Sequence, residues 1–416
     1  MGHIIMNITS SALFLAIVIA FWLFLLYYSI LAVLGTWYRI ETLTTKPHRP
    51  SEWPSVDILI PAYNEGKVLA DTLNAMASLE YEGPLNIYVL NDSSTDDTGE
   101  IADYYASLFP HIHHIKVPQG EPKGKARVLN YGLSLTKGEM VVIYDADNMP
   151  EKDAVKYLVM KALENDRYAG AVGYYKSYNM YKNNLTTMIG LEILLYQLIM
   201  QLGRWKLFKL GSFTGTNMLI KRSILEEIGG WDDYALAEDA EITLNITSRG
   251  YLIPVEPRAQ TWEQEPENLR VWWKQRTRWM IGNLYLISKT LENRHYRTGK
   301  NLINAIQLLS IYYVFIFMVI LSDTWFILGL LGILSVGVDL PLITLWFQSW
   351  WIYVAQLIAG AFVEREITYK SVLMAMLMYF TYAQLWLLIL INAQIQIRKE
   401  ARRGKKAIVW EKTARF

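Results

Sequence analysis

The sequence contains no cysteine among its 416 residues. Disulfide bonds, thiolate metal sites and cysteine nucleophiles are therefore excluded. A charge excess of either sign is also lacking, because 40 Lys and Arg balance 39 Asp and Glu to give a formal net charge of +1. The whole protein thus has no field that attracts nucleic acid, and nucleic acid is not expected as a partner. The absence of any repeat period or low-complexity tract excludes solenoids and repeat arrays.

Charged residues are missing from residues 12–36, an apolar run that exceeds the ~20 residues needed to cross a bilayer. This run predicts a membrane helix within residues 1–40. A cleaved signal peptide is the competing interpretation, but the run is too long for one and residues 1–10 carry no Lys or Arg. Basic residues after the run place its C-terminal end in the cytosol by the positive-inside tendency. These residues are Arg39, Lys46, His48 and Arg49.

Long apolar runs return at residues 302–321, 325–338, 343–363 and 372–397. They predict four further membrane helices within residues 299–397, although the first can instead lie at the membrane interface with Tyr312 and Tyr313 among the headgroups. The tail, residues 398–416, is strongly basic and is expected on the cytosolic side. An even number of crossings then keeps it beside the globular part. We therefore expect a multi-pass plasma-membrane protein whose globular domain faces the cytosol.

Residues 50–298 read as an ordinary soluble domain. Residues 56–60, 85–90 and 140–144 predict buried strands, and residues 66–79 and 126–135 have helical spacing. Strands that alternate with helices predict a parallel sheet in an α/β domain. Residues 185–210 are also apolar, but Glu192 and Arg204 interrupt them, so a core or interface helix is expected there.

Polar side chains follow each predicted strand: Tyr63 and Glu65 after the first, Asp92 after the second, and Asp145 and Asp147 after the third. Ligands bind outside the carboxyl ends of parallel strands, so these residues should converge on one sheet edge. Two carboxylates at the Asp-x-Asp spacing can reach one hard cation together with diphosphate oxygens. Such a pair also occurs in surface turns, but its position after a strand favours a Mg²⁺ or Mn²⁺ site for a nucleotide sugar.

Two further segments carry charged groups suited to sugar transfer. Lys125 lies in a glycine-containing loop where an ammonium group can neutralise phosphate, although a solvated surface loop is the alternative. Glu238 and Asp239 open a helical segment, where simple capping would also account for them. The functional interpretation makes Asp239 a general base that takes the proton of an acceptor hydroxyl, with Glu238 as the second candidate.

The string Gln275-Arg276-Thr277-Arg278-Trp279 gathers two guanidinium groups, an amide and a large aromatic ring. Arginine forks suit a leaving diphosphate, and a tryptophan face suits the apolar side of a sugar ring. A basic interfacial helix with a tryptophan anchor is the alternative.

Taken in order, these motifs resemble the D, DxD, xED, QxxRW signature of processive family-2 glycosyltransferases, which include synthases of poly-N-acetylglucosamine, hyaluronan, chitin and cellulose. The layout, with one membrane helix before the soluble domain and several after it, is similar too. The resemblance implies a GT-A fold, which is a Rossmann-like mixed sheet, beside an α-helical transmembrane domain. It also implies a UDP-sugar donor, a polysaccharide acceptor and, as further partners, accessory secretion subunits.

The resemblance implies a role for each motif residue. The residues that would hold the uridine are Tyr63, Glu65 and Asp92. Those that would approach the diphosphate are Lys125 and Asp145, with Asp147 on the metal. Those that would meet the leaving group and the acceptor end are Gln275, Arg278 and Trp279, with Asp239 as the base.

Two looser resemblances concern the acceptor and the donor pocket. Gly215 and Thr216 occupy the place of a small-residue segment below the acceptor channel. Trp410 opens a tail segment that resembles the gating segments that fold over the donor pocket in related synthases.

Three functions are compatible with this sequence. The first is a processive inverting synthase whose own helices form a channel for the polymer, and the second is a single-transfer enzyme that makes a glycolipid. The third is a transport or receptor protein that binds a nucleotide sugar without catalysis, which the intact Asp239 and the QxxRW string disfavour. The string together with the downstream spans favours processivity. N-acetylglucosamine is the leading sugar, with glucose and alternating polymers still open.

Overall fold

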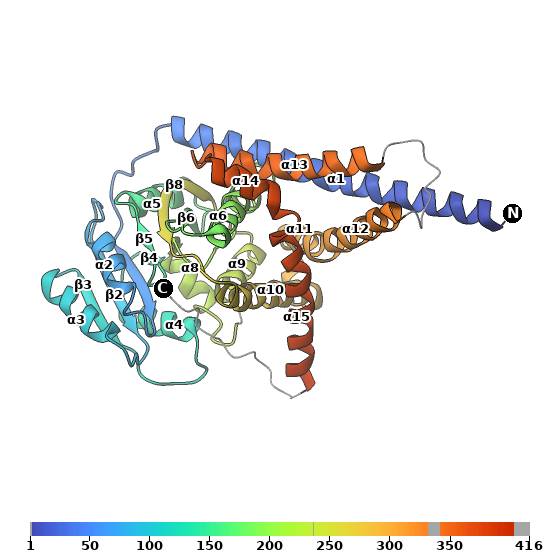
Figure 1. The fold of residues 1–416 in the computed structure, drawn as a ribbon. Helices are drawn as coiled ribbons and strands as arrows, with labels where there is room; N and C mark the ends of the chain where they lie inside the picture. The colour runs from blue at the N-terminus through green and yellow to red at the C-terminus, as the bar shows by residue number, and fades with distance from the viewer. Residues whose placement is uncertain (1, 236, 332–341, 403–416) are drawn as a thin grey trace.

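The computed structural model describes residues 2–235, 237–331 and 342–402, which form a globular α/β part and a group of long helices that project from it (Figure 1). Eight strands among the described residues make one sheet in the order β3-β2-β1-β4-β7-β6-β8-β5. The strands are β1 (Val56–Ala62), β2 (Leu85–Asn91), β3 (Ile112–Lys116), β4 (Met140–Ile143), β5 (Met149–Pro150), β6 (Gly170–Ser177), β7 (Met218–Lys221) and β8 (Val255–Glu263).

The three predicted strands are β1, β2 and β4, and they run parallel to one another as expected. The short strand β3 continues this parallel group. Neither β3 nor the helix before it was predicted from the sequence. Beyond β4 the direction changes, because β7 pairs with β4 antiparallel, and β6 pairs with β7 antiparallel. The sheet is therefore mixed, which confirms the α/β fold class.

Helices cover both faces of the sheet (Figure 1). Those of the globular part are α2 (Leu69–Ala77), α3 (Thr98–Leu108), α4 (Lys125–Leu135), α5 (Ala154–Leu163), α8 (Arg222–Ile228), α9 (Glu238–Ser248) and α10 (Leu269–Glu292), followed by the short turn η2 (Arg294–Tyr296). Successive residues of β1 enter different cores, as the two-residue period of a strand requires: Ile58 packs with α2, α3 and α5, whereas Leu59 packs with α4. The core around Leu59 also contains Leu31 of the N-terminal helix, so that helix is built into the globular part.

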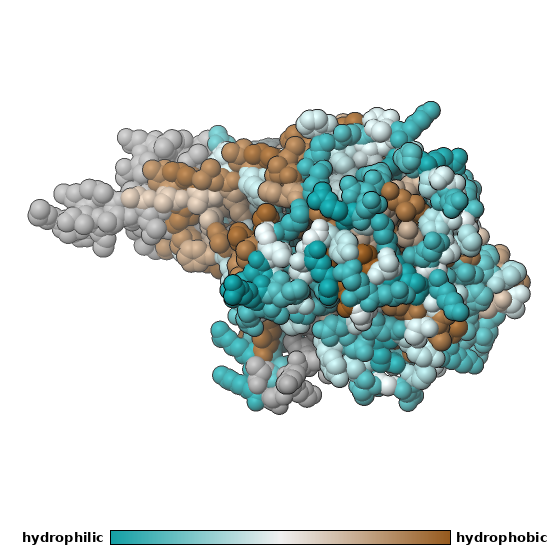
Figure 2. All heavy atoms as spheres, turned by 180° about the vertical axis from the view of Figure 1, so that it is seen from behind, coloured by the Kyte–Doolittle hydropathy of each residue, from teal (hydrophilic) through white to brown (hydrophobic). Residues whose placement is uncertain are grey.

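The remaining helices are long and apolar. They are α1 (Gly2–Thr44), α6 (Asn184–Tyr196) with its π-helical continuation η1 (Gln197–Gly203) and α7 (Arg204–Phe208), α11 (Gly299–Leu309) with η3 (Ser310–Phe315) and α12 (Ile316–Leu330), α13 (Leu342–Val363), α14 (Tyr369–Met378) and α15 (Tyr382–Arg402). Apolar residues gather on the projecting helices, while hydrophilic residues dominate the globular part (Figure 2).

Within the described residues, three helical stretches are long and apolar enough to cross a membrane: Leu15–Thr44, Asn184–Phe208 and Gly299–Leu321. In the second stretch, 72% of the apolar segment is buried inside the protein, whereas in the first stretch 22% is buried. This burial agrees with the expectation of a core helix at residues 185–210.

The predicted C-terminal spans have different shapes. In Figure 1, α12 and α13 lie alongside α1. The predicted span at residues 372–397 is broken, because α14 and α15 meet at an angle of 49°. The predicted span at residues 325–338 lies partly outside the described residues, and residues 325–330 of its described part belong to α12. Because α12 continues without a break from the helix that contains residues 302–321, the expectation of two separate spans is wrong for the described residues.

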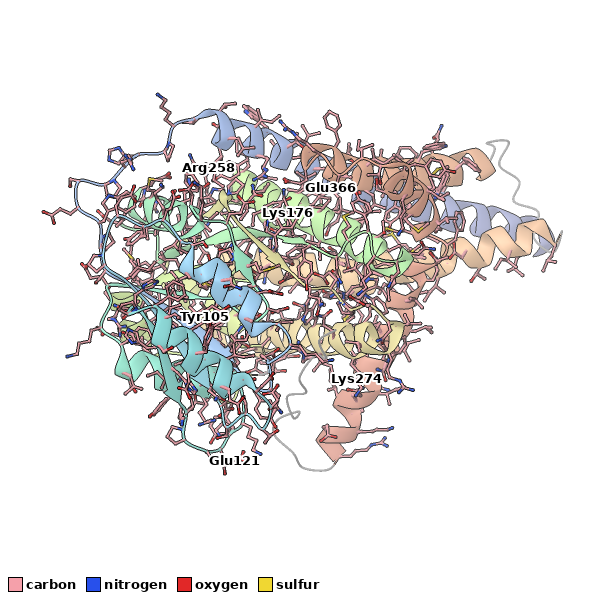
Figure 3. The ribbon with its side chains drawn as sticks, turned by 60° about the vertical axis from the view of Figure 1, so that its left-hand side comes forward. Tyr105, Glu121, Lys176, Arg258, Lys274 and Glu366 are labelled. Carbon is pink, nitrogen blue, oxygen red and sulfur yellow. The ribbon has the colours of Figure 1, made fainter. Side chains whose placement is uncertain are left out.

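Close helix packing and a buried ion cluster join the projecting helices to the sheet. A side chain at Gly35 would meet a backbone oxygen of η1 at 2.1 Å, so only glycine allows this approach of α1. Arg39 of α1, expected from sequence among the exposed basic flanks, is 4% exposed and pairs with Glu364 at 2.9 Å. Lys176 of β6 binds the same carboxylate at 2.6 Å, at the junction shown in Figure 3. These contacts connect α1 and the end of α13 directly to the sheet.

Candidate active site

Polar side chains from the carboxyl ends of β1, β2 and β4 line one cleft of about 1030 Å³. Tyr63 and Glu65 follow β1, Asp92 follows β2, and Asp145 and Asp147 follow β4. The structure thus brings these side chains together at the sheet edge where the strand order predicts a ligand site. Trp410, the residue expected over the donor pocket, lies outside the described residues.

The first part of the cleft combines an exposed aromatic ring with buried acids. Tyr63 is 41% exposed, which leaves its ring free for stacking on a flat ligand. Glu65 is buried beside it, and Asp92 pairs with Arg127 of α4. A planar base with hydrogen-bond donors fits this combination.

Lys125, the first residue of α4, joins three segments at the centre of the cleft. Its Nζ donates to Asp145 Oδ1 at 2.6 Å and to the carbonyl of Gly215 at 2.6 Å, and it lies 3.2 Å from Glu238 Oε1. Burial opposes its charge, but the carboxylates of Asp145 and Glu238 outweigh that effect and raise the pKa of Lys125. The interpretation as a solvated surface is therefore wrong for Lys125, although Lys123 in the same loop is exposed.

Gly215 and Thr216 lie directly against these charged groups. Gly215 has a φ of +84°, a conformation that favours glycine, and a Cβ there would lie 3.4 Å from Asp239 Oδ2. The hydroxyl of Thr216 accepts the backbone N–H of Asp145 at 3.1 Å. The small-residue segment therefore lies between the Asp-x-Asp pair and the candidate base, and it lines the cleft there.

Asp239 lies in the first turn of α9, as the sequence predicts. Its Oδ1 accepts the backbone N–H of Ala240 at 2.8 Å, so it helps to cap the helix. Burial and the charge of Glu238 raise the pKa of Asp239 to about 7, against the lowering effect of Lys125. A carboxylate with this pKa can hold or release a proton near neutral pH, which is the property that a general base needs. Capping and proton transfer are thus compatible at this residue.

A second acidic pair lies beside Asp147 and was not singled out in the sequence. Glu263 ends β8, and Glu265 follows two residues later. Burial and neighbouring negative charge raise the pKa of Glu263 well above its ordinary value, and burial raises the pKa of Glu265 to about 7. The signal that could have found them is an acid-rich turn after a strand, but β8 itself was not predicted.

The donor set at this edge fits a hard divalent cation. Asp145 and Asp147 offer carboxylate oxygens, the ligands that Mg²⁺ and Mn²⁺ prefer. Within the described residues, no group of three or more His, Cys, Asp or Glu side chains is arranged as a complete metal site. A cation held by two carboxylates then needs further oxygens, and a diphosphate carries them.

The string on α10 faces the same cleft from the opposite side. Gln275, Arg278 and Trp279 line the cleft, and Trp279 is 37% exposed. Arg276 differs from them, because its side chain is fully buried and pairs with Glu192 of α6 at 2.6 Å. The ion pair accounts for the glutamate that interrupts the apolar run of residues 185–210.

The cleft does not end at the carboxylates but continues between the apolar helices. Polar side chains line this inner part from several helices, namely Tyr28, Tyr196, Arg204, Asn304, Gln356 and Gln384. Apolar side chains between them include Phe24, Leu308 and Leu357. A hydroxyl-rich, elongated ligand can therefore extend from the catalytic edge into the helical part.

Comparisons with known proteins identify the family of the chain. Residues 54–282 match the family described as "Glycosyltransferase like family 2". The chain is 40% identical over 370 residues to the protein named "Probable glycosyltransferase YdaM" from Bacillus subtilis, covering 88% of each chain. It is 31% identical over 277 residues to the poly-beta-1,6-N-acetyl-D-glucosamine synthase of Staphylococcus aureus, covering 63% of this chain and 65% of that one.

Solved structures that match the chain in part include a mannosyltransferase from Pyrobaculum calidifontis in complex with GDP-Man and Mn²⁺. The TM-score is 0.48 at 21% identity, covering 83% of this chain and 97% of that chain. The Staphylococcus aureus protein TarS, residues 1–349, gives a TM-score of 0.42 at 15% identity, covering 84% and 92%.

Proposed function

The chain belongs to glycosyltransferase family 2, and from that premise we propose that it is an inverting, processive synthase that adds sugars from a UDP-sugar to a growing polysaccharide. The enzyme class, a glycosyltransferase, follows from family membership. The finer proposal is carried by one observation: the cleft that holds Asp239 and Trp279 continues between the apolar helices. A polymer that grows at the carboxylates has a path into the membrane part.

The chemistry follows from the side chains at the sheet edge. When bound at Asp145 and Asp147, Mg²⁺ or Mn²⁺ supplies Lewis-acid stabilisation of the diphosphate charge. Asp239 accepts the proton of the acceptor hydroxyl as that oxygen bonds to the anomeric carbon. The bond from this carbon to the diphosphate oxygen breaks, and UDP leaves with the electron pair toward Lys125 and Arg278. Attack from the side opposite the leaving group inverts the anomeric configuration.

N-acetylglucosamine is the sugar we propose, with glucose as the alternative. The support is the 31% identity over 277 residues to a poly-beta-1,6-N-acetyl-D-glucosamine synthase. Trp279 offers its ring as a platform for the sugar at the acceptor end.

A single-transfer enzyme that makes a glycolipid is the second candidate. It is favoured by the apolar side chains in the inner part of the cleft, such as Phe24, Leu308 and Leu357, which suit a lipid chain. The two candidates differ in product: the first predicts long polymers while donor is still abundant, and the second predicts one added sugar.

The decisive experiment is a transfer assay on the purified protein with a panel of UDP-sugars. We expect turnover of UDP-N-acetylglucosamine with Mg²⁺ or Mn²⁺, and long products at low donor conversion. Products that carry only one added sugar would replace processive synthesis by the glycolipid function. Absence of turnover with every UDP-sugar would contradict the proposed donor class.

We further propose that the globular domain and the C-terminal end of α15 share the cytosolic side of the plasma membrane. The support is the charge at the helix ends, because basic residues follow α1 at Lys46, His48 and Arg49 and occupy the last turn of α15 at Lys399 and Arg402. The chain has no cysteine, so Arg402→Cys introduces a single labelling site. Labelling is expected only after the cells are permeabilised. Labelling of intact cells from outside would contradict this topology.

A further inference from the structure

Arg276 occupies an unspecified position of the QxxRW string, yet its guanidinium contacts Glu192, Gln275 and Trp279. Its Nη2 donates to Glu192 Oε2 at 2.6 Å and its Nε to the same oxygen at 3.2 Å. Its Nη1 donates to Gln275 Oε1 at 2.7 Å. The centre of its guanidinium lies 4.0 Å from the ring centroid of Trp279. One planar group thus contacts two of the cleft-lining residues of the string, Gln275 and Trp279.

The carboxylate that holds Arg276 also receives a hydrogen bond from the membrane part. Tyr382, the first residue of α15, donates its hydroxyl to Glu192 Oε2 at 2.7 Å. The same hydroxyl accepts the indole N–H of Trp272 at 2.8 Å. Because Tyr382 lies at the 49° bend between α14 and α15, the Arg276 contacts depend on the position of that bend.

Fixing Trp279 in place has a physical cost that these contacts offset. A partly exposed tryptophan on a helix can adopt several rotamers, and ordering it costs conformational entropy. A cation over the ring face favours one orientation, more strongly where water is excluded. The buried guanidinium in turn needs Glu192, because a buried charge without a partner is strongly unfavourable. Lysine cannot replace it, because an ammonium group has neither the planar face nor the fork that reaches both Glu192 and Gln275.

We propose that Arg276 is a positioning residue for the acceptor: it holds Trp279 and Gln275 in the orientation that receives the end of the sugar chain. Glu192 and Tyr382 anchor it to α6 and to the α14–α15 bend. This inference rests on the proposed function in one respect, which is that Trp279 and Gln275 meet the acceptor. It assigns Arg276 no direct contact with substrate.

The contrasting interpretation is that Arg276 only joins α6 to α10 and stabilises the fold. The two interpretations differ in which kinetic constant changes. A joint between helices alters stability and all kinetic constants together, whereas a positioning residue alters acceptor binding and leaves UDP affinity unchanged.

The first test is kinetic and uses Arg276→Lys and Tyr382→Phe, with Arg222→Lys as the matched control. Arg222 also pairs with a buried carboxylate, that of Asp57, but at the opposite end of the sheet. For Arg276→Lys we expect the KM for a short oligosaccharide acceptor to rise about tenfold, while UDP affinity by calorimetry stays within about twofold. Tyr382→Phe, which loses only the hydroxyl, should raise that KM about threefold. The control should leave both values unchanged.

The second test follows Trp279 itself and needs no activity. The full-length protein is labelled with 5-fluorotryptophan, and the Trp279 resonance is assigned by its loss in Trp279→Phe. This resonance should shift or broaden in Arg276→Lys and Tyr382→Phe but not in Arg222→Lys. A shifted resonance in a protein that transfers no sugar would reject the proposed function and keep the positioning role. An unmoved resonance, or an unchanged acceptor KM in an active enzyme, would overturn the positioning role.

Discussion

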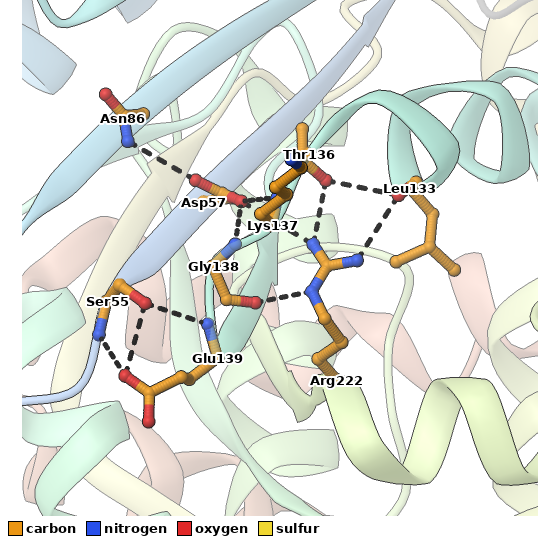
Figure 4. A network of polar contacts seen from close by, with 9 residues as sticks. All are labelled: Ser55, Asp57, Asn86, Leu133, Thr136, Lys137, Gly138, Glu139 and Arg222. Atoms are coloured by element: carbon orange, nitrogen blue, oxygen red, sulfur yellow. Dashed lines mark hydrogen bonds and ion pairs between the residues drawn. The ribbon is translucent and has the colours of Figure 1, made fainter.

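Two buried polar clusters lie at opposite ends of the same strands. They differ in whether the positive charges of the protein balance the carboxylates. The first, which we call the Asp57 cluster, lies where β1 and β4 begin (Figure 4). The second, the Asp239 cluster, lies beyond the opposite ends of these strands and comprises Lys125, Asp145, Glu238 and Asp239. Both combine residues from several strands, helices and loops around one sheet.

The Asp57 cluster is complete. Asp57 Oδ2 accepts the backbone N–H groups of Lys137, at 2.9 Å, and of Gly138. Arg222 lies 3.5 Å from the same carboxylate and donates to the carbonyls of Gly138 and Leu133. One acid thus faces one base, and no ligand is needed to satisfy either charge. Such a cluster fixes the loop between α4 and β4.

The Asp239 cluster is unbalanced. Its single ammonium group, that of Lys125, faces the carboxylates of Asp145, Glu238 and Asp239. The excess negative charge and the burial raise the pKa of Asp239 to about 7. The comparison teaches how a functional site differs from a structural one. A buried cluster with more carboxylates than cations favours the binding of a metal ion and raises the pKa of a carboxyl group, so it indicates a functional site.

The largest expected effect comes from removing the divalent cation that we propose to bind beside the Asp239 cluster. EDTA should abolish sugar transfer, and excess Mg²⁺ or Mn²⁺ should restore it, because without a cation between them the carboxylates of Asp145 and Asp147 would repel the diphosphate. The melting temperature of the protein without donor should change little, since the Asp57 cluster needs no metal. Full turnover in the chelator would remove the metal from the mechanism.

The next effect concerns the base. Asp239→Asn keeps the shape and most hydrogen bonding of the side chain but removes the proton acceptor, so turnover should fall by ~10²-fold or more. UDP affinity, measured by calorimetry, should persist, because the acceptor proton plays no part in donor binding. Near-normal synthesis would instead leave Glu238 as the candidate base. Equal loss of UDP affinity and synthesis would assign Asp239 to the donor pocket or to folding.

A change in the complete cluster should act on stability and not on catalysis. Arg222→Met keeps the aliphatic stem but leaves Asp57 without its cation, which should lower the free energy of unfolding by about 3 kcal/mol. The thermal midpoint, followed by intrinsic fluorescence, should fall by about 5–10 °C. Turnover per folded molecule should stay close to that of the unmodified protein. A selective loss of turnover without a lower midpoint would contradict the division between the two clusters.

The smallest effect is the pH dependence. The base must be deprotonated to act, and the pKa of about 7 means that Asp239 is half protonated at pH 7 and mostly protonated at pH 6. The value of kcat/KM for the donor should therefore fall about fivefold between pH 7 and pH 6 at constant ionic strength. UDP affinity over the same range is the control and should stay nearly constant. A flat profile down to pH 5 would place the relevant pKa near that of an ordinary carboxyl group.

Local sequence patterns were sufficient for much of the fold. The runs that became β1, β2 and β4 are short and β-branched, and the polar residues that follow them converge as parallel strands require. The short strand β3 was missed because its Ile-His-His-Ile-Lys sequence has neither an apolar run nor a clear alternation. The antiparallel entry of β7 was also unpredictable, since pairing direction depends on how a distant segment returns to the sheet.

The sequence by itself determined the enzyme family, the order of the motifs and the presence of long apolar helices, because each depends on residue types at fixed local spacing. Only the tertiary structure decided which charges meet. Glu192 and Arg276 are 84 residues apart in the chain, yet they form one ion pair beside Trp279. The raised pKa of Asp239 likewise depends on burial and on the position of Lys125. Such long-range electrostatic contacts depend on distance and solvent exclusion, which a linear pattern of residues does not contain.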